Sequence, residues 1–221
     1  IPHTIKRQGQ DYHSETTDTG FASATGIRKL LGNESSENLS ALKSQIAPAA
    51  FDLTKDFLSQ SPLTEDDFSM LLRYKLLTEN RAKLTEYFGV NKELSNRIYK
   101  HLNEFESFSS FADQLKTKNI TRTAINRALL HILLDIKASD VQEVTKRGCV
   151  DYIRVLGFRK EAAGLLKEFS DIPEIPLITN LSAAPVLCEI DIKADQIYQM
   201  CASQKYGVPY QNEYQRKMLV V

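Results

Sequence analysis

Apolar residues recur every three or four positions through the middle of the chain, which is the spacing of amphipathic helices. The segment PLTEDDFSMLLRYKLLT is the clearest example, with an apolar stripe formed by Phe68, Leu71, Leu72 and Leu76. Thr64 precedes this stripe and Asp67 follows Thr64 by three positions, so a capping box predicts that the helix begins there. The same spacing predicts further helices over residues 35–46, 81–89, 91–105, 109–119, 121–136 and 138–148.

The two ends of the chain have a different pattern. IPHTIKR at residues 1–7 alternates like a strand that is already under way, so we expect the chain to begin inside a domain. A polar loop and a short helix follow. Later, a strand at 151–158, a helix at 159–169 and a strand at 174–180 predict a small βαβ unit, and a last helix is expected over 189–204.

Together these patterns predict a mainly α fold in three parts. We expect a helical domain at residues 34–148, preceded at 1–33 by the residual end of an α/β domain and followed at 149–221 by a small α/β unit. The composition, 42% hydrophobic and 25% charged, is that of a globular protein and not of a disordered chain. A chain of 221 residues is long enough to bury a core of its own.

Charge and cysteine content exclude several classes of protein. The chain has 28 basic and 28 acidic residues, which argues against a wholly basic nucleic-acid binder but leaves room for a local basic face. Its three cysteines have no metal-ligand spacing, so we expect reduced thiols, a cytoplasmic location and no bound metal. No apolar run approaches the roughly 18 residues of a membrane helix, so we expect no membrane partner.

The segment GFASATGIRKLL, residues 20–31, places hydroxyl residues directly before a helix. Ser23 and Thr25 are good N-cap residues, and the free amides and dipole of a helix start favour an anion. Arg28 follows Thr25 by three positions and could complete a phosphate clamp. The alternative is a plain capped helix with a surface arginine. Lys6 and Arg7 favour the phosphate site, because they end the expected strand, and α/β folds bind ligands beside strand ends.

A second candidate site is the basic stretch LKTKNITRTAINR at a helix–helix junction. Four basic residues fall within twelve positions without an acid among them, namely Lys116, Lys118, Arg122 and Arg127. Such a patch suits an RNA backbone, and the alternative is a solvated helix face. A second, looser basic set is diluted by acids and comprises Lys146, Arg147, Arg154, Arg159 and Lys160. His131 lies on an apolar helix, where we expect it to be packed or capped rather than catalytic.

Four segments, taken in order, resemble one known family. PHTIKRQGQDYH, FASATGIRKLL, LKTKNITRTAINRALLHILL and YIRVLGF are similar to the carboxyl-terminal part of the bacterial tRNA(Met) cytidine acetate ligase family. That family belongs to the HIGH-type nucleotidylyltransferase superfamily. The resemblance implies a cytoplasmic enzyme that activates acetate with ATP as acetyl-adenylate. The enzyme then acetylates N4 of the wobble cytidine in elongator tRNA(Met), and any Mg²⁺ travels with ATP.

The resemblance also implies roles for individual residues. Ser23, Thr25 and Arg28 fall on the superfamily's second nucleotide motif, which makes the start of the short helix part of an ATP site. Arg7 precedes the DYH segment and takes the position of an arginine that contacts ATP, with Lys6 beside it. The helical domain of the family engages tRNA, so the resemblance extends that role to Lys116, Lys118, Arg122 and Arg127.

The chain departs from the family pattern in two respects. It contains no H-x-G-H element, whose histidines polarise the nucleotide phosphates, so we expect no adenylation by these residues alone. Ile120 stands where relatives can carry an aromatic residue that stacks on a base. Two alternatives stay open: a different nucleotidylyltransferase with a helical appendage, and a non-catalytic helical RNA-binding module. The sequence assigns no catalytic residue and no oligomeric state.

Overall fold

The structure, a computed structural model, describes residues 3–6, 21–31, 36–48, 50–52, 62–170, 175–181, 188–209 and 212–221. It divides into two compact units, Ile1–Leu63 and Thr64–Val221. The sequence analysis places its boundaries elsewhere, after residues 33 and 148.

Two helices of the first unit pack on each other, α1 (Ala24–Leu30) and α2 (Ser36–Gln45). The backbone amide of Ala22, just before α1, donates a hydrogen bond of 2.8 Å to the side chain of Gln45 at the end of α2. A boundary after residue 33 would separate two helices that share this contact. The expected strand at 1–7 is wrong over its described part, because residues 3–6 have no regular structure and pair with no described strand.

The helices of the second unit begin where the capping box predicts. The backbone amide of Thr64 donates to the carboxylate of Asp67 at 2.7 Å, and the first turn is a 3-10 helix that continues into α4. The elements in order are η1 (Glu65–Phe68), α4 (Ser69–Thr78), η2 (Arg81–Glu86), α5 (Lys92–His101), η3 (Leu102–Glu104), α6 (Phe108–Leu115), α7 (Arg122–Leu134) and α8 (Ala138–Lys146). The predicted helix at 81–89 is therefore a 3-10 helix.

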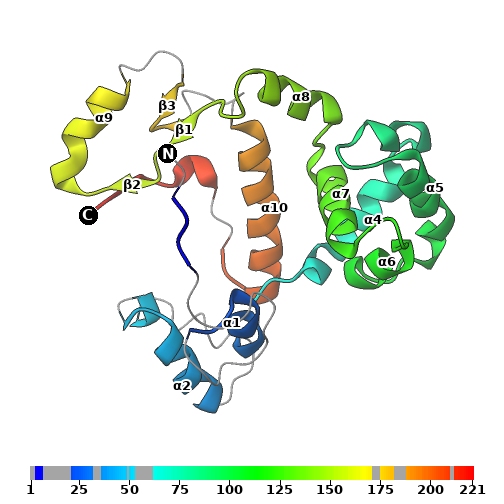
Figure 1. Cartoon of the computed structure of the whole chain (residues 1–221), viewed down its shortest axis with the longest axis horizontal. Helices are drawn as coiled ribbons and strands as arrows, with labels where there is room; N and C mark the ends of the chain where they lie inside the picture. The colour runs from blue at the N-terminus through cyan, green and yellow to red at the C-terminus, as the bar shows by residue number, and fades with distance from the viewer. Residues whose placement is uncertain are drawn as a thin grey trace. The chain divides into compact units, whose positions relative to one another are not determined.

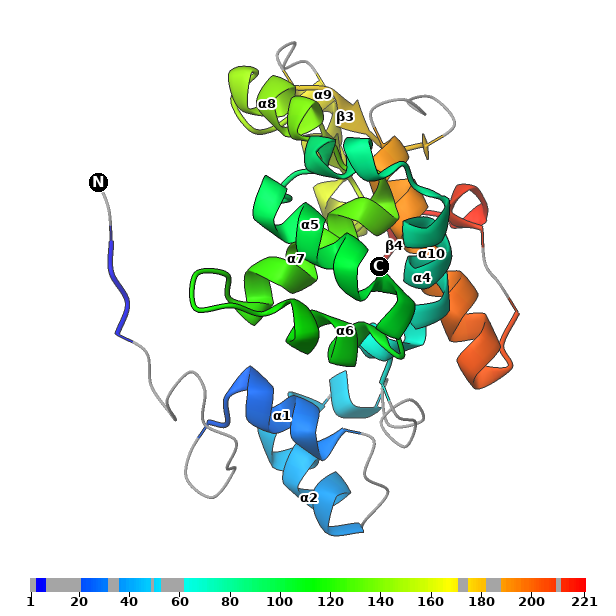
Figure 2. The same cartoon turned by 90° about the vertical axis from the view of Figure 1, so that its right-hand side faces the viewer.

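Helix α7 supplies the centre of the main core. Its residues Ile125, Ala128, Leu129 and Ile132 are fully buried and pack in one cluster with the apolar faces of α4, α5 and α6. Figure 2 shows α5, α6 and α7 gathered in one bundle. The burial of this stripe confirms the helical periodicity that predicted it.

The described residues in the last part of the second unit form four very short strands. β1 (Ile153–Arg154) and β3 (Leu177–Ile178) pair in parallel with α9 (Ala163–Ser170) between them in the chain, which confirms the order of the predicted βαβ unit. β2 (Gly157–Phe158) pairs in parallel with β4 (Leu219–Val220), a contact that the sequence analysis missed.

The predicted strand at 151–158 is therefore two strands in two separate ladders. The chain leaves the first ladder at Val155, whose amide donates to the carbonyl of Ile178 at 3.0 Å. It enters the second at Gly157, where an added Cβ would lie 2.7 Å from the carbonyl oxygen of Leu219. Only glycine permits this approach of the two backbones.

Helix α10 (Glu189–Tyr206) connects the strands to the helical bundle, and Figure 1 shows it between the two. It contacts α7 and η1 on one side and η6 (Glu213–Gln215) on another. No helix among the described residues is long and apolar enough to cross a membrane. The described residues also contain no group of three or more side chains that could hold a metal ion.

Candidate functional site

The start of α1 is a capped helix terminus. Ser23 is fully buried, and its hydroxyl accepts a hydrogen bond of 3.0 Å from the amide of Gly26. Ser23 therefore stabilises the helix start and is not exposed to a ligand. Thr25 is half-buried and Arg28 is exposed, and their spacing places them on the same side of the helix. The first turn of α1 has no acidic residue, so nothing in that turn opposes an anion.

The structure describes one of the other two residues expected at this site. Lys6 is exposed and forms no hydrogen bond or ion pair with any residue that the structure describes. Arg7 lies outside the described residues. The part of the expected nucleotide site that the structure places is thus the helix start with Ser23, Thr25 and Arg28.

The junction between α6 and α7 is a tight turn that exposes two of the predicted basic residues. The hydroxyl of Thr117 accepts hydrogen bonds from the amides of Asn119 and Ile120, both at 3.2 Å. Ile120 packs against the core, and this contact leaves Lys116 and Lys118 exposed on either side of Thr117.

An arginine from a neighbouring helix fixes this junction. Arg97 of α5 donates to the carbonyl oxygens of Gln114 at 2.6 Å and Leu115 at 2.9 Å, which lie at the end of α6. These carbonyls have no partner within their own helix, so Arg97 acts as a C-terminal cap. It holds the turn that carries the two exposed lysines in place.

Arg122 differs from the other three predicted RNA-binding residues because its charge is already paired. Its guanidinium contacts both carboxylate oxygens of Asp113 at 2.8 Å and Glu65 at 3.5 Å. Both acids lie outside the basic stretch in sequence, and the fold brings them to it. Lys116, Lys118 and Arg127 are exposed and form no ion pair among the described residues.

A partly buried group of charges joins three helices elsewhere in the unit. Asp135 ends α7 with a left-handed backbone, φ 60°, and its carboxylate accepts hydrogen bonds from Lys75 of α4 at 2.6 Å and Lys193 of α10 at 2.5 Å. The buried Tyr87 donates its hydroxyl proton to Glu79 and lies 3.1 Å from Asp135. This cluster fixes α10 against the bundle.

The ionisation of the cluster follows from these contacts. Burial would raise the pKa of Asp135, but the hydrogen bonds from Lys193 and Lys75 lower the pKa to about 2. Burial and the hydrogen bond to Glu79 raise the pKa of the Tyr87 hydroxyl above its ordinary value. Asp135 is therefore ionised and Tyr87 neutral throughout the physiological range, and we assign both a structural role.

His131 also has a structural role, as the sequence analysis expects. It is half-buried, and its Nδ1 lies 2.7 Å from the carbonyl oxygen of Phe88. Its ring stacks at a tilt against the ring of Phe88 with centroids 5.3 Å apart.

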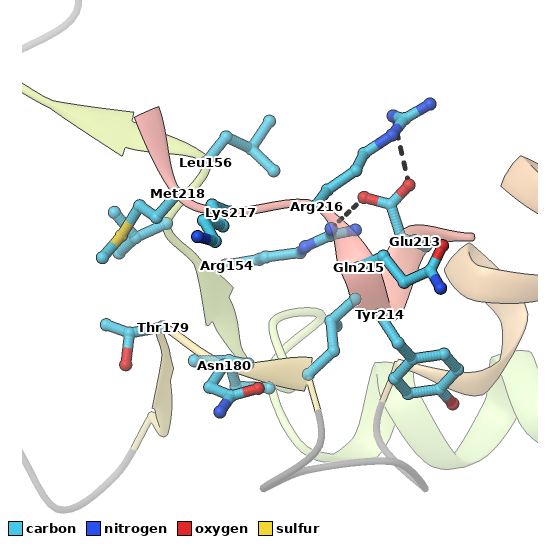
Figure 3. A pocket seen from close by; sticks show the side chains of 13 residues that line it. Arg154, Leu156, Thr179, Asn180, Glu213, Tyr214, Gln215, Arg216, Lys217 and Met218 are labelled. Atoms are coloured by element: carbon cyan, nitrogen blue, oxygen red, sulfur yellow. Dashed lines mark hydrogen bonds and ion pairs between the residues drawn. The ribbon is translucent and has the colours of Figure 1, made fainter. Parts of the chain in front are cut away.

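A pocket of about 580 Å³ lies where β1 and β3 end, and sequence reasoning missed it. Its lining comes from three segments, residues 154–156, 178–181 and 213–218 (Figure 3). Arg154 of β1 pairs with the buried Glu213, and Arg216 lies 3.1 Å from the same carboxylate. The sequence analysis placed Arg154 in the looser basic set. No local signal could have paired it with Glu213, because the two are far apart in the chain.

A second carboxyl group lies behind the pocket. The carboxylate of Asp195 on α10 is 3.6 Å from Arg216 and interacts electrostatically with Glu213. Burial raises the pKa of Asp195, and so does its contact with Glu213. Burial would also raise the pKa of Glu213, but the hydrogen bonds with Asp195 and Arg154 lower it on balance. These opposite directions favour the charged form of Glu213, the carboxylate that pairs with Arg154 and Arg216.

The chain belongs to the HIGH nucleotidyl transferase family, whose profile matches residues 1–213. Within that family it is similar to proteins named tRNA(Met) cytidine acetate ligase, and the resemblance of its four segments is thereby confirmed. The relative from Halothermothrix orenii is 30% identical over 98% of the chain and 52% of its own length. The relative from Bacillus subtilis is 32% identical over 90% of the chain and 49% of its own length.

Solved structures show the same fold. Thermotoga maritima TmcAL in its ligand-free form I matches with a TM-score of 0.83 and 20% identity over 99% of the chain and 55% of that protein. The form bound with alpha-thio ATP matches with a TM-score of 0.75 and 20% identity over 90% of the chain and 52% of that protein. The chain thus spans about half the length of the relatives that it matches.

The low pKa of Asp135 predicts a pH-dependent contribution to stability. Asp135→Asn should lower the free energy of unfolding by about 1 kcal/mol at pH 7, less than the full pKa shift implies, because the side chain is 41% exposed and solvent screens it. The folded pKa is depressed, so this contribution is complete above pH 4 and disappears as the pH falls toward 2. Urea unfolding between pH 3 and 7 measures it.

The exposed Glu168 on α9 forms no ion pair among the described residues and provides the control, Glu168→Gln. A difference between the wild type and Asp135→Asn that stays the same from pH 7 to pH 3 would contradict the assignment.

Proposed function

We propose that this chain is part of an ATP-dependent ligase that acetylates N4 of the wobble cytidine in elongator tRNA(Met). The observation that carries the proposal is the similarity to proteins named tRNA(Met) cytidine acetate ligase over 90% or more of the chain. One structural neighbour, Thermotoga maritima TmcAL, holds alpha-thio ATP in its crystal structure, which supports ATP as the nucleotide.

The proposed reaction has two balanced steps. A carboxylate oxygen of acetate attacks the α-phosphorus of ATP, the bond to the β-phosphate breaks, and pyrophosphate leaves with Mg²⁺. The N4 amine of cytidine then attacks the carbonyl of acetyl-adenylate, loses a proton and displaces AMP. Both steps develop negative charge on phosphate oxygens, which cationic side chains and helix amides stabilise. We place the enzyme in the cytoplasm with its tRNA substrate.

The start of α1 is the proposed phosphate-binding part of this chain. Buried Ser23 holds the first turn, Thr25 and Arg28 lie on one side of it, and no acid in that turn repels an anion. Lys6 and Arg7 complete the site in the proposal. In this proposal these residues bind and orient ATP, and none of them transfers a proton.

The junction of α6 and α7 is the proposed tRNA contact. The free charges at this surface are those of Lys116, Lys118 and Arg127, whereas Arg122 acts through Asp113 and Glu65 as a positioning residue. Exposed cations held on a rigid turn suit the phosphates of RNA, because binding them releases counterions.

The function is tested with the full protein, ATP, labelled acetate and tRNA, followed by nucleoside mass spectrometry. We expect N4-acetylcytidine that requires both ATP and acetate. Consumption of ATP without acetylated cytidine would favour a different nucleotidylyltransferase. Binding of tRNA without any use of ATP would favour a non-catalytic RNA-binding module.

Arg28→Ala should weaken ATP binding about tenfold, since it removes one charge-assisted contact to phosphate, and should leave the fold intact because Arg28 is exposed. Calorimetric titration of ATP into the full protein measures the affinity. Lys43→Ala, an exposed cation on α2 of the same unit, is the matched control. Equal ATP affinity in both variants would return Arg28 to the role of a surface residue.

Reversing the three free charges together, Lys116→Glu, Lys118→Glu and Arg127→Glu, should weaken tRNA binding by at least tenfold. The slope of log K against log salt should also fall by about 3, one for each lost phosphate contact. Fluorescence anisotropy at several salt concentrations measures both quantities. A control with the same charge change at the exposed Lys83, Lys92 and Lys167 should bind almost as well as the wild type. Identical salt slopes for the two triple variants would rule out this surface.

A further inference from the structure

The pocket at the ends of β1 and β3 is built like a ligand site. Adjacent parallel strands end there, and open α/β sheets bind ligands at the carboxyl ends of their strands. The segment 213–218 forms the opposite wall. The pocket volume, about 580 Å³, falls in the ordinary range of ligand pockets.

The charges that line this pocket leave an excess of positive charge. Glu213 is the only carboxylate among the lining residues, and it is shared by Arg154 and Arg216. Lys217 is exposed and has no ion pair or hydrogen bond among the described residues. Two cations are therefore held by one buried acid, and a third, Lys217, is exposed and can meet a ligand.

Figure 3 shows where the charged and polar side chains lie around the pocket. The side chain of Lys217 lies beside the stem of Arg154, while the guanidinium of Arg216 is turned to the other side of Glu213. Thr179 and Asn180 lie on the opposite wall, just after β3. Cations on one wall and small polar side chains on the other make an environment that favours an anionic group.

The same pocket also has an apolar part. Tyr214 is 43% exposed and lies in its wall, on the other side of the Arg154–Glu213 pair from the exposed Leu156 (Figure 3). A flat base can stack on an exposed aromatic ring whatever its sequence. A ligand with a flat apolar part and an anionic part matches both features, and a nucleotide has both.

We propose that this pocket binds one nucleotide of an RNA strand, with its phosphate on Lys217 and Arg154 and its base against Tyr214. The exposure of the site favours RNA over a free nucleotide, because Thr179, Gln215 and Lys217 are all exposed. A free small ligand is normally enclosed over most of its surface, whereas a nucleotide within a strand must leave on two sides. The proposal rests on the proposed function, since it gives the same tRNA a second contact at residues other than Lys116, Lys118 and Arg127.

The test uses Lys217→Ala and Lys217→Arg in the full chain, with anisotropy of labelled tRNA at several salt concentrations. We expect Lys217→Ala to weaken tRNA binding about fivefold and to lower the salt slope by about 1, whereas Lys217→Arg keeps both near wild type. Lys160→Ala, an exposed cation just outside the pocket lining, is the control and should change neither. Unchanged unfolding curves confirm that the exposed substitutions leave the fold intact.

AMP, titrated by calorimetry, separates the two sources of a nucleotide. Saturable AMP binding that Lys217→Ala abolishes, together with unchanged tRNA affinity, overturns the RNA assignment in favour of a free nucleotide. No change in either ligand overturns the proposal altogether. Loss of tRNA affinity in Lys217→Ala supports the pocket even if the wild type forms no N4-acetylcytidine, so the failure of the proposed function is detected separately.

Discussion

The carboxylate of Asp135 is the point at which the bundle and the last long helix are tied together. It lies at the left-handed end of α7 and accepts hydrogen bonds from Lys75 of α4 and Lys193 of α10. Because α10 also contacts η6, the position of Glu213 and the pocket wall depends on where α10 is held. Two lysines on one aspartate would leave an excess of positive charge, and Glu79 offsets it by contacting Lys75 at 3.1 Å.

Acids from distant segments decide which cations are free to act. Arg122 is paired with Asp113 and Glu65, and Arg154 with Glu213, so each of these arginines positions structure as well as carrying charge. Lys116, Lys118, Arg127 and Lys217 are exposed and have no such partner in the part of the chain that the structure describes. A chain with equal numbers of acids and bases can therefore present local basic surfaces.

The sequence predicts those features that depend on neighbours in the chain. The capping box at Thr64, the buried stripe of α7 and the cap at Ser23 are all local patterns, and the structure confirms each of them. The order of β1, α9 and β3 was predictable for the same reason. The strand expected at residues 1–7 fails over residues 3–6 because alternation forms a strand only where a partner supplies hydrogen bonds.

The features that the sequence did not predict depend on contacts between distant residues. The pairing of Arg122 with Glu65 lies outside any short window, and so does the partner of β2. The pocket was missed because its walls come from three separate segments, of which residues 213–218 carry no motif. The roles of Arg28 and of the free cations stay predictions until the binding measurements are made.

The close approach at Gly157 has a consequence for the order in which the molecule folds. β2 has no described partner except β4, whose residues follow it only after α9, β3 and α10. During synthesis on the ribosome, the backbone amides and carbonyls of residues 157–158 therefore cannot form their strand hydrogen bonds until β4 has been made. A pairing with such a long loop closes slowly, so the helical bundle, whose contacts are closer in sequence, should form first. The pocket at the end of β1 and β3 would then be among the last features of this unit to be completed.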